Sequence, residues 1–295
     1  MLIRTFKNIH SLKTFLQMIF QLKPYSILFL AFFLFACGAE TTGDSKTSGD
    51  MSQFTKDEKF NEAHEIPEAL DFKGTGKMIT FETADGTPGS AYAIVNDLSS
   101  NKALFVIHEW WGLNDHIKQE ADKLYSELKD VNIIALDLYD GKVTDNPDDA
   151  GKIMGSVKEE RLDAIIKGAL TYVGKDAKVG TIGWCFGGGW SLKSSILAGD
   201  QGAGCVMYYG MPVMEPAKLA PIKADVLGLF ANKDEWITPK VVSDFEVVMK
   251  AIGKNISTKE FEADHAFANP SSPRYVEEAA QEANAMALAF LKERL

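Results

Sequence analysis

The sequence predicts an α/β fold, in which a mostly parallel, doubly wound sheet begins with an antiparallel hairpin. Two features of the segment order predict it. The first two β-rich segments are joined by a turn signal, and after them buried-type strands alternate with helices to the end of the chain. Such alternation builds parallel sheets that are covered on both faces. We find no internal repeat and no second domain in the sequence.

The chain begins with features of a secretory signal. Residues 26–35 form an apolar run that is shorter than the roughly 20 residues of a membrane-spanning helix but fits a signal's apolar region. The Leu-Phe-Ala-Cys sequence ending at Cys37 resembles the lipobox of bacterial lipoproteins, which implies cleavage before Cys37 and lipidation of its thiol. A plain signal anchor and a buried apolar segment are the alternatives. Translation from Met18 would leave a signal of more usual length.

The next stretch, residues 38–57, is rich in Gly, Ser, Thr and Asp. Because it has almost nothing to bury, it is typical of a flexible tether. We therefore expect a signal peptide at residues 1–36, a lipidated tether at 37–60 and one folded domain at 61–295. This organisation predicts an exported protein of the cell envelope that contacts the membrane only through a lipid anchor.

The composition excludes several classes of partner. With 46% hydrophobic and 24% charged residues, the chain is ordinary for a soluble globular protein. The net charge is −10, and the first 36 residues hold four basic and no acidic side chains, so the rest carries −14. An acidic body argues against nucleic acid or an anionic membrane surface as a partner. A monomer is consistent with the sequence, which does not determine the oligomeric state.

The elements follow in order along the chain. Residues 78–83 and 91–96 are β-rich and flank the hairpin signal Ala-Asp-Gly-Thr-Pro-Gly. The expected strands that follow are 103–108, 131–136, 178–182, 205–209, 224–230 and 257–261. The expected helices start at Asn114, span 149–173 with a break or kink around Gly155, and then span 187–198, 239–252 and 275–291.

The most informative motif is Gly-Trp-Cys-Phe-Gly, with Cys185 at its centre, directly after the strand 178–182. A Gly-x-nucleophile-x-Gly sequence forms a strained strand-to-helix turn that exposes the central side chain above the sheet. At the N-terminus of the following helix, the macrodipole favours thiolate over thiol. The alternative is a glycine-rich turn with an inert, buried cysteine. We expect no bridge from Cys185 to Cys205, because Cys205 begins its strand at the opposite edge of the sheet.

Reactive residues also follow three other strands. Ligands in open α/β sheets lie beyond the carboxyl ends of strands. There the sequence places His108 and Glu109, then Asp234, then His265. Cys185, Asp234 and His265 stand in the chain order of an α/β-hydrolase triad, so we expect an α/β-hydrolase fold.

Each member of the triad has a physical role. His265 would exchange a proton with Cys185, and Asp234 would fix the imidazole tautomer. The alternatives are that Asp234 caps the next helix, that Glu235 takes its place, or that His265 is a surface histidine. We expect the backbone N–H groups of Phe186 and Trp110 to form the oxyanion hole.

The sequence predicts neither a metal nor another cofactor. A His-Glu-x-x-His zinc helix does not start at His108, because position 112 is Gly where that spacing needs His. Substrate contacts are expected around the triad, where aromatic side chains gather in the sequence. The alternative is that these side chains pack the core or the rim of the site. The expected contacts are Trp111, Trp184, Tyr139, Asn269 and Arg274.

From about residue 78 to the C-terminus, the chain resembles the dienelactone hydrolase family. The matching residues are the His-Glu-Trp-Trp-Gly-Leu-Asn sequence from His108, Asp137-Leu138-Tyr139, the Cys185 motif, Asp234 and His265-Ala266-Phe267. The resemblance implies hydrolysis of a cyclic or simple ester through an acyl-cysteine without a cofactor. It also implies that Glu109 takes the thiol proton when substrate binds, so that the resting thiol is neutral.

One departure from the family bears on the substrate. The family's dienelactone enzymes have an arginine four residues after the catalytic histidine, and this chain has Asn269. The helical stretch 147–157 contains no arginine either, although Arg274 is nearby in sequence. The sequence therefore predicts an ester or lactone hydrolase with an uncharged ester, lactone or thioester at least as suitable as a carboxylated one. The alternatives are a thioesterase or other acyl hydrolase on the same triad, and an inactive hydrolase-like binding module.

Overall fold

The computed structural model describes residues 51–62, 64, 67, 70–95 and 100–295, which belong to one compact unit, Ser45–Leu295. The expected signal peptide, the lipidation site Cys37 and most of the expected tether lie outside these residues. Within the described part of the chain, none of the helices has the length and apolar character needed to cross a membrane.

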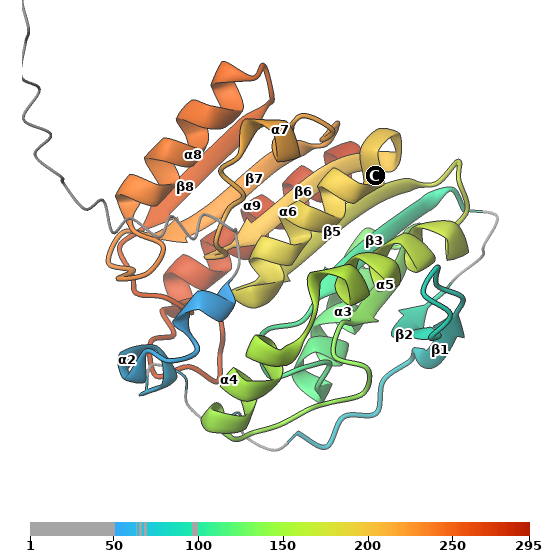
Figure 1. The fold of residues 1–295 in the computed structure, drawn as a ribbon, viewed down its shortest axis with the longest axis horizontal. Coiled ribbons are helices and arrows are strands. Elements are labelled where there is room, and N and C mark those ends of the chain that lie inside the picture. The colour runs from blue at the N-terminus through green and yellow to red at the C-terminus, as the bar shows by residue number, and fades with distance from the viewer. Residues whose placement is uncertain (1–50, 63, 65–66, 68–69, 96–99) are drawn as a thin grey trace, which may run out of the picture. The chain divides into compact units, whose positions relative to one another are not determined.

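A single eight-stranded sheet forms the centre of the unit, in the order β1-β2-β4-β3-β5-β6-β7-β8 (Figure 1). Its strands are β1 Lys77–Phe81, β2 Gly89–Ile94, β3 Lys102–Ile107, β4 Asn132–Asp137, β5 Lys178–Trp184, β6 Gly202–Tyr208, β7 Asp225–Ala231 and β8 Ile256–Phe261. β2 pairs antiparallel with both β1 and β4, and the other pairings are parallel. This arrangement confirms the predicted mostly parallel sheet with an antiparallel N-terminal hairpin.

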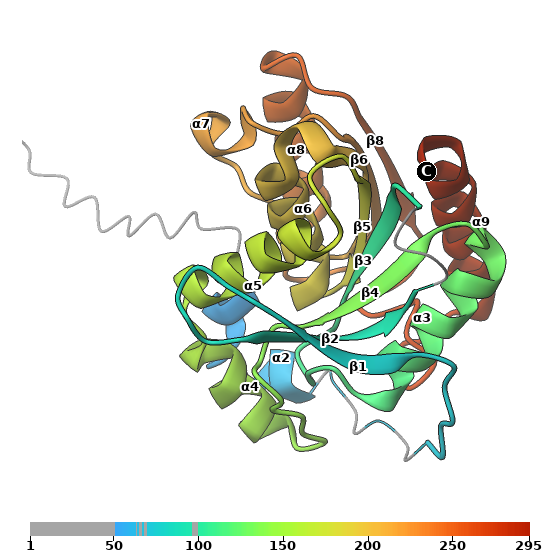
Figure 2. The same cartoon turned by 90° about the vertical axis from the view of Figure 1, so that its right-hand side faces the viewer.

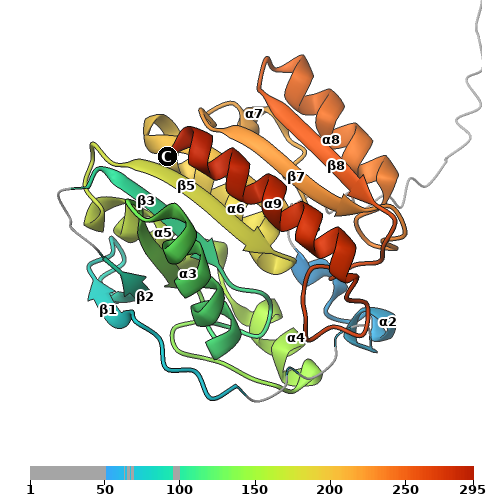
Figure 3. The same cartoon turned by 180° about the vertical axis from the view of Figure 1, so that it is seen from behind.

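Helices cover both faces of the sheet, as Figure 2 shows edge-on. One face carries α3 Asp115–Leu128 and α9 Glu277–Arg294, which contact each other. Both helices lie in front of the sheet in Figure 3. The other face carries α5 Glu159–Tyr172, α6 Phe186–Ala198, α7 Pro216–Leu219 and α8 Pro239–Ala251. β3, β4 and β5 are buried almost throughout, as expected for strands covered on both sides.

Local sequence signals start several of these helices. The side-chain oxygen of Asn114 accepts a hydrogen bond from the N–H of Ile117 at 3.1 Å and so caps α3 where the sequence predicts it. The expected segment 149–173 forms two helices, α4 Pro147–Ser156 and α5. The break falls at Val157, whose backbone is extended, and Gly155 remains inside α4.

Ordered structure begins inside the stretch expected to be a tether. A 3₁₀ turn, η1 Met51–Phe54, and a short helix, α2 Glu58–Glu62, precede the sheet. Met51 and Phe60 are 1% and 0% exposed, so these two apolar side chains hold residues that are otherwise polar against the body. α2 lies beside the carboxyl ends of the parallel strands (Figure 1).

Candidate functional site

Cys185 occupies a tight turn between β5 and α6. Its backbone angles are φ 54° and ψ −117°, a conformation that costs a non-glycine residue on the order of 1–3 kcal/mol. Glycines allow the close packing around it. A Cβ on Gly183 would lie 2.1 Å from the carbonyl oxygen of Gly187, and one on Gly187 would lie 2.4 Å from that of Ile107. The strand-to-helix turn is therefore built as the motif predicts.

Asp234 and His265 are paired and buried beyond the ends of β7 and β8. His265 Nδ1 donates to Asp234 Oδ2 at 2.6 Å. Burial alone would raise the pKa of Asp234, but the interaction with His265 and two backbone N–H groups outweighs it, so the pKa lies below its ordinary value. Those N–H groups belong to Trp236 and Ile237 and donate to Asp234 Oδ1 at 2.8 and 2.9 Å.

The neighbouring carboxylate, Glu235, is placed quite differently. Its side chain is 66% exposed and lies 3.7 Å from the amino group of Lys59. The structure thus brings Asp234, and not Glu235, to the histidine.

The thiol of Cys185 lies close to two imidazoles. Its sulfur, a nitrogen of His265 and a nitrogen of His64 all lie within 4.8 Å of one another. The contact to His64 Nε2 is 3.9 Å. His265 Nε2 is buried and has no hydrogen-bond partner among the described residues. The nitrogen not bonded to Asp234 is therefore the one available to the thiol.

Burial determines the resting state of the thiol. Cys185 is 1% exposed. Burial raises the pKa of the Cys185 thiol well above its ordinary value, and the negative charge of Glu109 raises it further. The N–H of Phe186, the first residue of α6, lowers the pKa but does not compensate. The thiol is consequently neutral in this arrangement.

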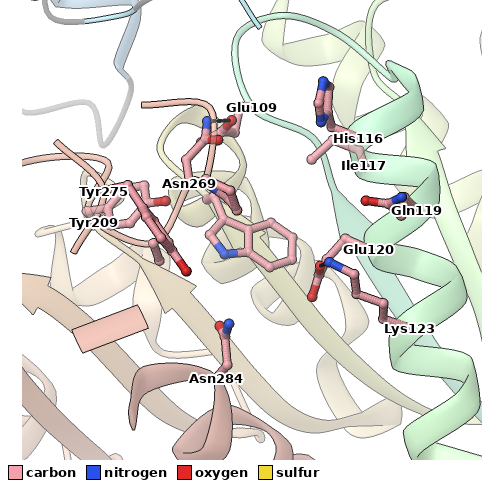
Figure 4. A pocket seen from close by; sticks show the side chains of 13 residues that line it. Glu109, His116, Ile117, Gln119, Glu120, Lys123, Tyr209, Asn269, Tyr275 and Asn284 are labelled. Atoms are coloured by element: carbon pink, nitrogen blue, oxygen red, sulfur yellow. Dashed lines mark hydrogen bonds and ion pairs between the residues drawn. The ribbon is translucent and has the colours of Figure 1, made fainter. Parts of the chain in front are cut away.

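Glu109 follows β3 and is held by Asn269. Asn269 Nδ2 donates to Glu109 Oε2 at 2.8 Å (Figure 4). Burial raises the pKa of Glu109 from 4.5 to about 7. At neutral pH this carboxyl group is therefore close to its midpoint and can accept or release a proton.

The loop that carries Glu109 is fixed by His108 and β4. His108 Nδ1 donates to the carbonyl oxygen of Glu109 at 2.6 Å, and its Nε2 accepts from the N–H of Leu138 at 3.2 Å. Burial lowers the pKa of His108 to about 4, so the ring is neutral. His108 thus has a structural role beneath the site.

A cavity of about 190 Å³ adjoins the site (Figure 4). One wall comes from α3, and the opposite wall from the loop after β8 and from α9. Its lining residues are Glu109, His116, Ile117, Gln119, Glu120, Lys123, Trp184, Tyr209, Ala268, Asn269, Pro270, Tyr275 and Asn284. Cys185 is not among them, so the cavity ends short of the sulfur.

Two of the expected substrate contacts, Trp184 and Asn269, line this cavity. Trp111 and Tyr139 are buried outside its lining. The guanidinium group of Arg274 lies 5.5 Å from the ring centre of Trp236, beside a different surface hollow.

The described residues of the N-terminal segment 51–64, which are 51–62 and 64, close the site, and this closure is not predicted from the sequence. The ring of Phe60 lies 5.4 Å from that of Trp110, 5.2 Å from that of Trp236 and 6.0 Å from that of His265. Trp236 Nε1 also donates to Asp57 Oδ2 at 3.0 Å. The only sequence signal was a phenylalanine and a histidine four residues apart, a spacing that would place both on one face of a helix. In the structure α2 ends at Glu62, and His64 follows it.

Similarities to known proteins agree with this geometry. The model of the dienelactone hydrolase family matches residues 90–295. Protein usf of Aquifex pyrophilus is 32% identical over 233 residues, which cover 75% of this chain and 99% of that protein. A carboxymethylenebutenolidase of Pseudomonas sp. is 31% identical over 122 residues, or 40% of this chain and 48% of that protein.

A solved structure shows the same fold. It is a dienelactone hydrolase-like promiscuous phosphotriesterase from metagenomic libraries, with a TM-score of 0.63 and 20% identity. The match covers 75% of this chain and 99% of that one. At this identity it supports the fold alone.

Proposed function

We propose that this chain, which belongs to the dienelactone hydrolase family, hydrolyses carboxylic esters or lactones through an acyl intermediate on Cys185. One observation carries the proposal. A cysteine on a strained strand-to-helix turn lies within 4.8 Å of an imidazole whose other nitrogen is bonded to a buried aspartate. Nucleophile, base and orienting carboxylate in this arrangement are the requirements of acyl transfer.

The chemistry proceeds in two halves. The sulfur of Cys185 attacks the substrate carbonyl carbon while its proton passes to His265 Nε2, and the ester C–O bond breaks as the alkoxide takes up that proton. Water then attacks the thioester, His265 accepts a proton from the water, and the acid product leaves as the proton returns to sulfur. Asp234 stabilises the charged imidazole in both halves, and the N–H groups of Phe186 and Trp110 would bind the oxyanion.

Glu109 gives the enzyme a second base. Because burial raises the pKa of this carboxyl group to about 7, it is partly ionised at neutral pH and can accept the proton of the Cys185 thiol. Its hydrogen bond from Asn269 holds the side chain at the cavity wall.

The lining of the cavity favours an uncharged substrate. Lys123 is the one lysine or arginine among its lining residues, and it is already 3.2 Å from the carboxylate of Glu120. The remaining polar groups include Glu109, Asn269 and Asn284, which suit neutral hydrogen-bonding partners. A substrate carboxylate would find no bidentate arginine there.

Substrate can reach the sulfur of Cys185 only if part of the closed site moves. A carbonyl carbon must come within about 3–3.5 Å of the nucleophile, yet Cys185 is only 1% exposed, and His64 Nε2 lies 3.9 Å from its sulfur. The ring of Phe60 also lies 6.0 Å from that of His265. Substrate entry from the cavity must therefore displace part of segment 51–64 or the Glu109 loop.

The test is a panel of neutral aryl esters, lactones and acyl thioesters with three proteins: wild type, Cys185→Ala and Cys205→Ala. Cys205 is the matched control, because it is equally buried but lies away from the site, beside Ser191. We expect Cys185→Ala to lose ester and lactone turnover and Cys205→Ala to keep it. Ester turnover retained by Cys185→Ala would refute the acyl-cysteine mechanism, and turnover of thioesters alone would refute the substrate class.

A further inference from the structure

His64 lies beside the thiol and has no role in the proposed mechanism. It is 9% exposed, lies at the end of the N-terminal segment and points Nε2 toward the sulfur of Cys185 at 3.9 Å. Its ring also lies 4.4 Å from that of Trp110 and 5.7 Å from that of His265. Segment 51–64 thus places a third potential ligand atom beside Cys185 and His265.

The hydrogen bonds of the two histidines determine which of their nitrogens can bind a ligand. His64 Nδ1 donates to the carbonyl oxygen of Phe60 at 2.6 Å, and His265 Nδ1 donates to Asp234 Oδ2 at 2.6 Å. Each Nε2 therefore carries a lone pair. Metal-binding histidines are oriented in this way, by a carboxylate or a backbone carbonyl on the other ring nitrogen.

We propose that Cys185, His64 and His265 bind a divalent transition-metal ion of the Zn²⁺ type. Thiolate sulfur and imidazole nitrogen are the ligands such ions prefer, and three protein ligands leave a fourth position for water. Binding replaces the S–H bond by a metal–sulfur bond and releases one proton to solvent.

The observed spacing is close to what an ion needs. With metal–sulfur and metal–nitrogen bonds of about 2.3 and 2.0–2.1 Å, a tetrahedral ion separates a sulfur and a nitrogen ligand by about 3.6 Å. The sulfur and His64 Nε2 are 3.9 Å apart, and all three ligand atoms lie within 4.8 Å of one another. Small side-chain rotations bring them to bonding distance. His265 Nε2, buried without a partner among the described residues, would gain one.

A bound ion would inhibit the proposed hydrolase activity. It would occupy the nucleophile and the base together, and it would tie segment 51–64 to the site through His64. Removal of the ion by a chelator would restore both groups, so the inhibition is reversible.

Co²⁺ is the probe, because thiolate-bound Co²⁺ shows a sulfur-to-metal charge-transfer band. The full-length chain is titrated with Co²⁺, and Zn²⁺ affinity is measured by competition. Cys185→Ala is compared with Cys205→Ala, and His64→Gln with His116→Gln, since His116 lines the cavity away from the sulfur. We expect the band at one equivalent in wild type and in both controls, and its loss in Cys185→Ala.

His64→Gln should weaken Zn²⁺ binding by at least about 100-fold, more than the ~10–100-fold that follows loss of a group that only orients a ligand. It should also raise the Zn²⁺ concentration that inhibits ester turnover by the same factor. Unchanged Zn²⁺ affinity in His64→Gln, or a charge-transfer band retained by Cys185→Ala, would overturn the site. Far-UV circular dichroism checks that each variant is folded. If His64→Gln does not fold, the comparison of Cys185→Ala with Cys205→Ala still tests the metal site. The Co²⁺ titration needs no substrate, and ester hydrolysis is assayed separately with a chelator present. Absence of metal binding is therefore distinguishable from absence of hydrolase activity.

Discussion

Replacing Glu109 by glutamine should stabilise the protein at alkaline pH and impair catalysis. The change removes the ionisable group and keeps the shape, and the amide oxygen of glutamine can still accept the hydrogen bond from Asn269. Because burial raises the pKa of Glu109 from 4.5 to about 7, the folded state resists its ionisation. The unfolded chain does not, so ionisation favours unfolding.

The magnitude follows from the two pKa values. Below about pH 4.5 the carboxyl group is protonated in both states and has no effect on stability. Between pH 4.5 and 7 it ionises in the unfolded chain alone, and the wild type loses free energy of unfolding progressively. The difference of about 2.5 in pKa, at about 1.36 kcal/mol for each pKa unit, gives up to about 3 kcal/mol above pH 7. Glu109→Gln should be more stable than wild type by that amount at pH 8 and equal to it near pH 4.

Urea unfolding followed from pH 4 to pH 8 measures this difference directly. Glu235→Gln is the matched control, because Glu235 is exposed and pairs only with exposed Lys59, so its replacement should change stability by less than about 1 kcal/mol at every pH. The activity of the wild type should rise through about pH 7 as Glu109 ionises, and this limb should be absent in Glu109→Gln. A constant stability difference across the pH range, or a less stable Glu109→Gln at pH 8, would refute the reasoning.

Two further predictions concern the closure and the triad. Phe60→Ala removes an aromatic ring that is fully buried over the site, and a loss of about 3 kcal/mol of packing should raise the alkylation rate of Cys185 about 100-fold. Mass spectrometry measures it, with the buried Cys205 as internal control, and labelling of Cys185 at the wild-type rate would contradict it. Asp234→Asn should lower kcat for ester hydrolysis on the order of 10³–10⁴-fold, because the imidazole tautomer is no longer fixed. A comparable loss in Glu235→Gln would show that the wrong carboxylate has been assigned.

The sheet and the carboxyl-end residues could be predicted because both depend on local pattern. Apolar runs in the sequence predict buried strands, and parallel connections place the carboxyl ends of these strands at one edge of the sheet. Cys185, Asp234 and His265 follow three such strands, so topology alone brings them together. The choice of Asp234 over Glu235 needed the structure to confirm the hydrogen bond, since the two are adjacent in the chain.

The N-terminal closure could not be predicted in the same way. Composition indicates that residues 38–57 have too little apolar surface to fold, but that average hides Met51 and takes no account of Phe60, three residues beyond this stretch. Their burial depends on a surface made by distant segments, including the rings of Trp110 and Trp236. Residues that pack only against tertiary structure leave no periodic signal in their own sequence.

Closure and ionisation are coupled by the same physical cause. Burial is the largest contribution to the raised pKa of both the Cys185 thiol and the Glu109 carboxyl group. A movement of segment 51–64 that lets substrate or water reach the sulfur, and through the opened site Glu109 as well, should hydrate these groups and return both pKa values toward their ordinary range. Glu109 then becomes a carboxylate at neutral pH and the thiol loses its proton more easily. In the proposed hydrolase, one displacement would therefore supply access, base and nucleophile together, whereas the closed arrangement keeps the sulfur neutral and shielded from oxidants.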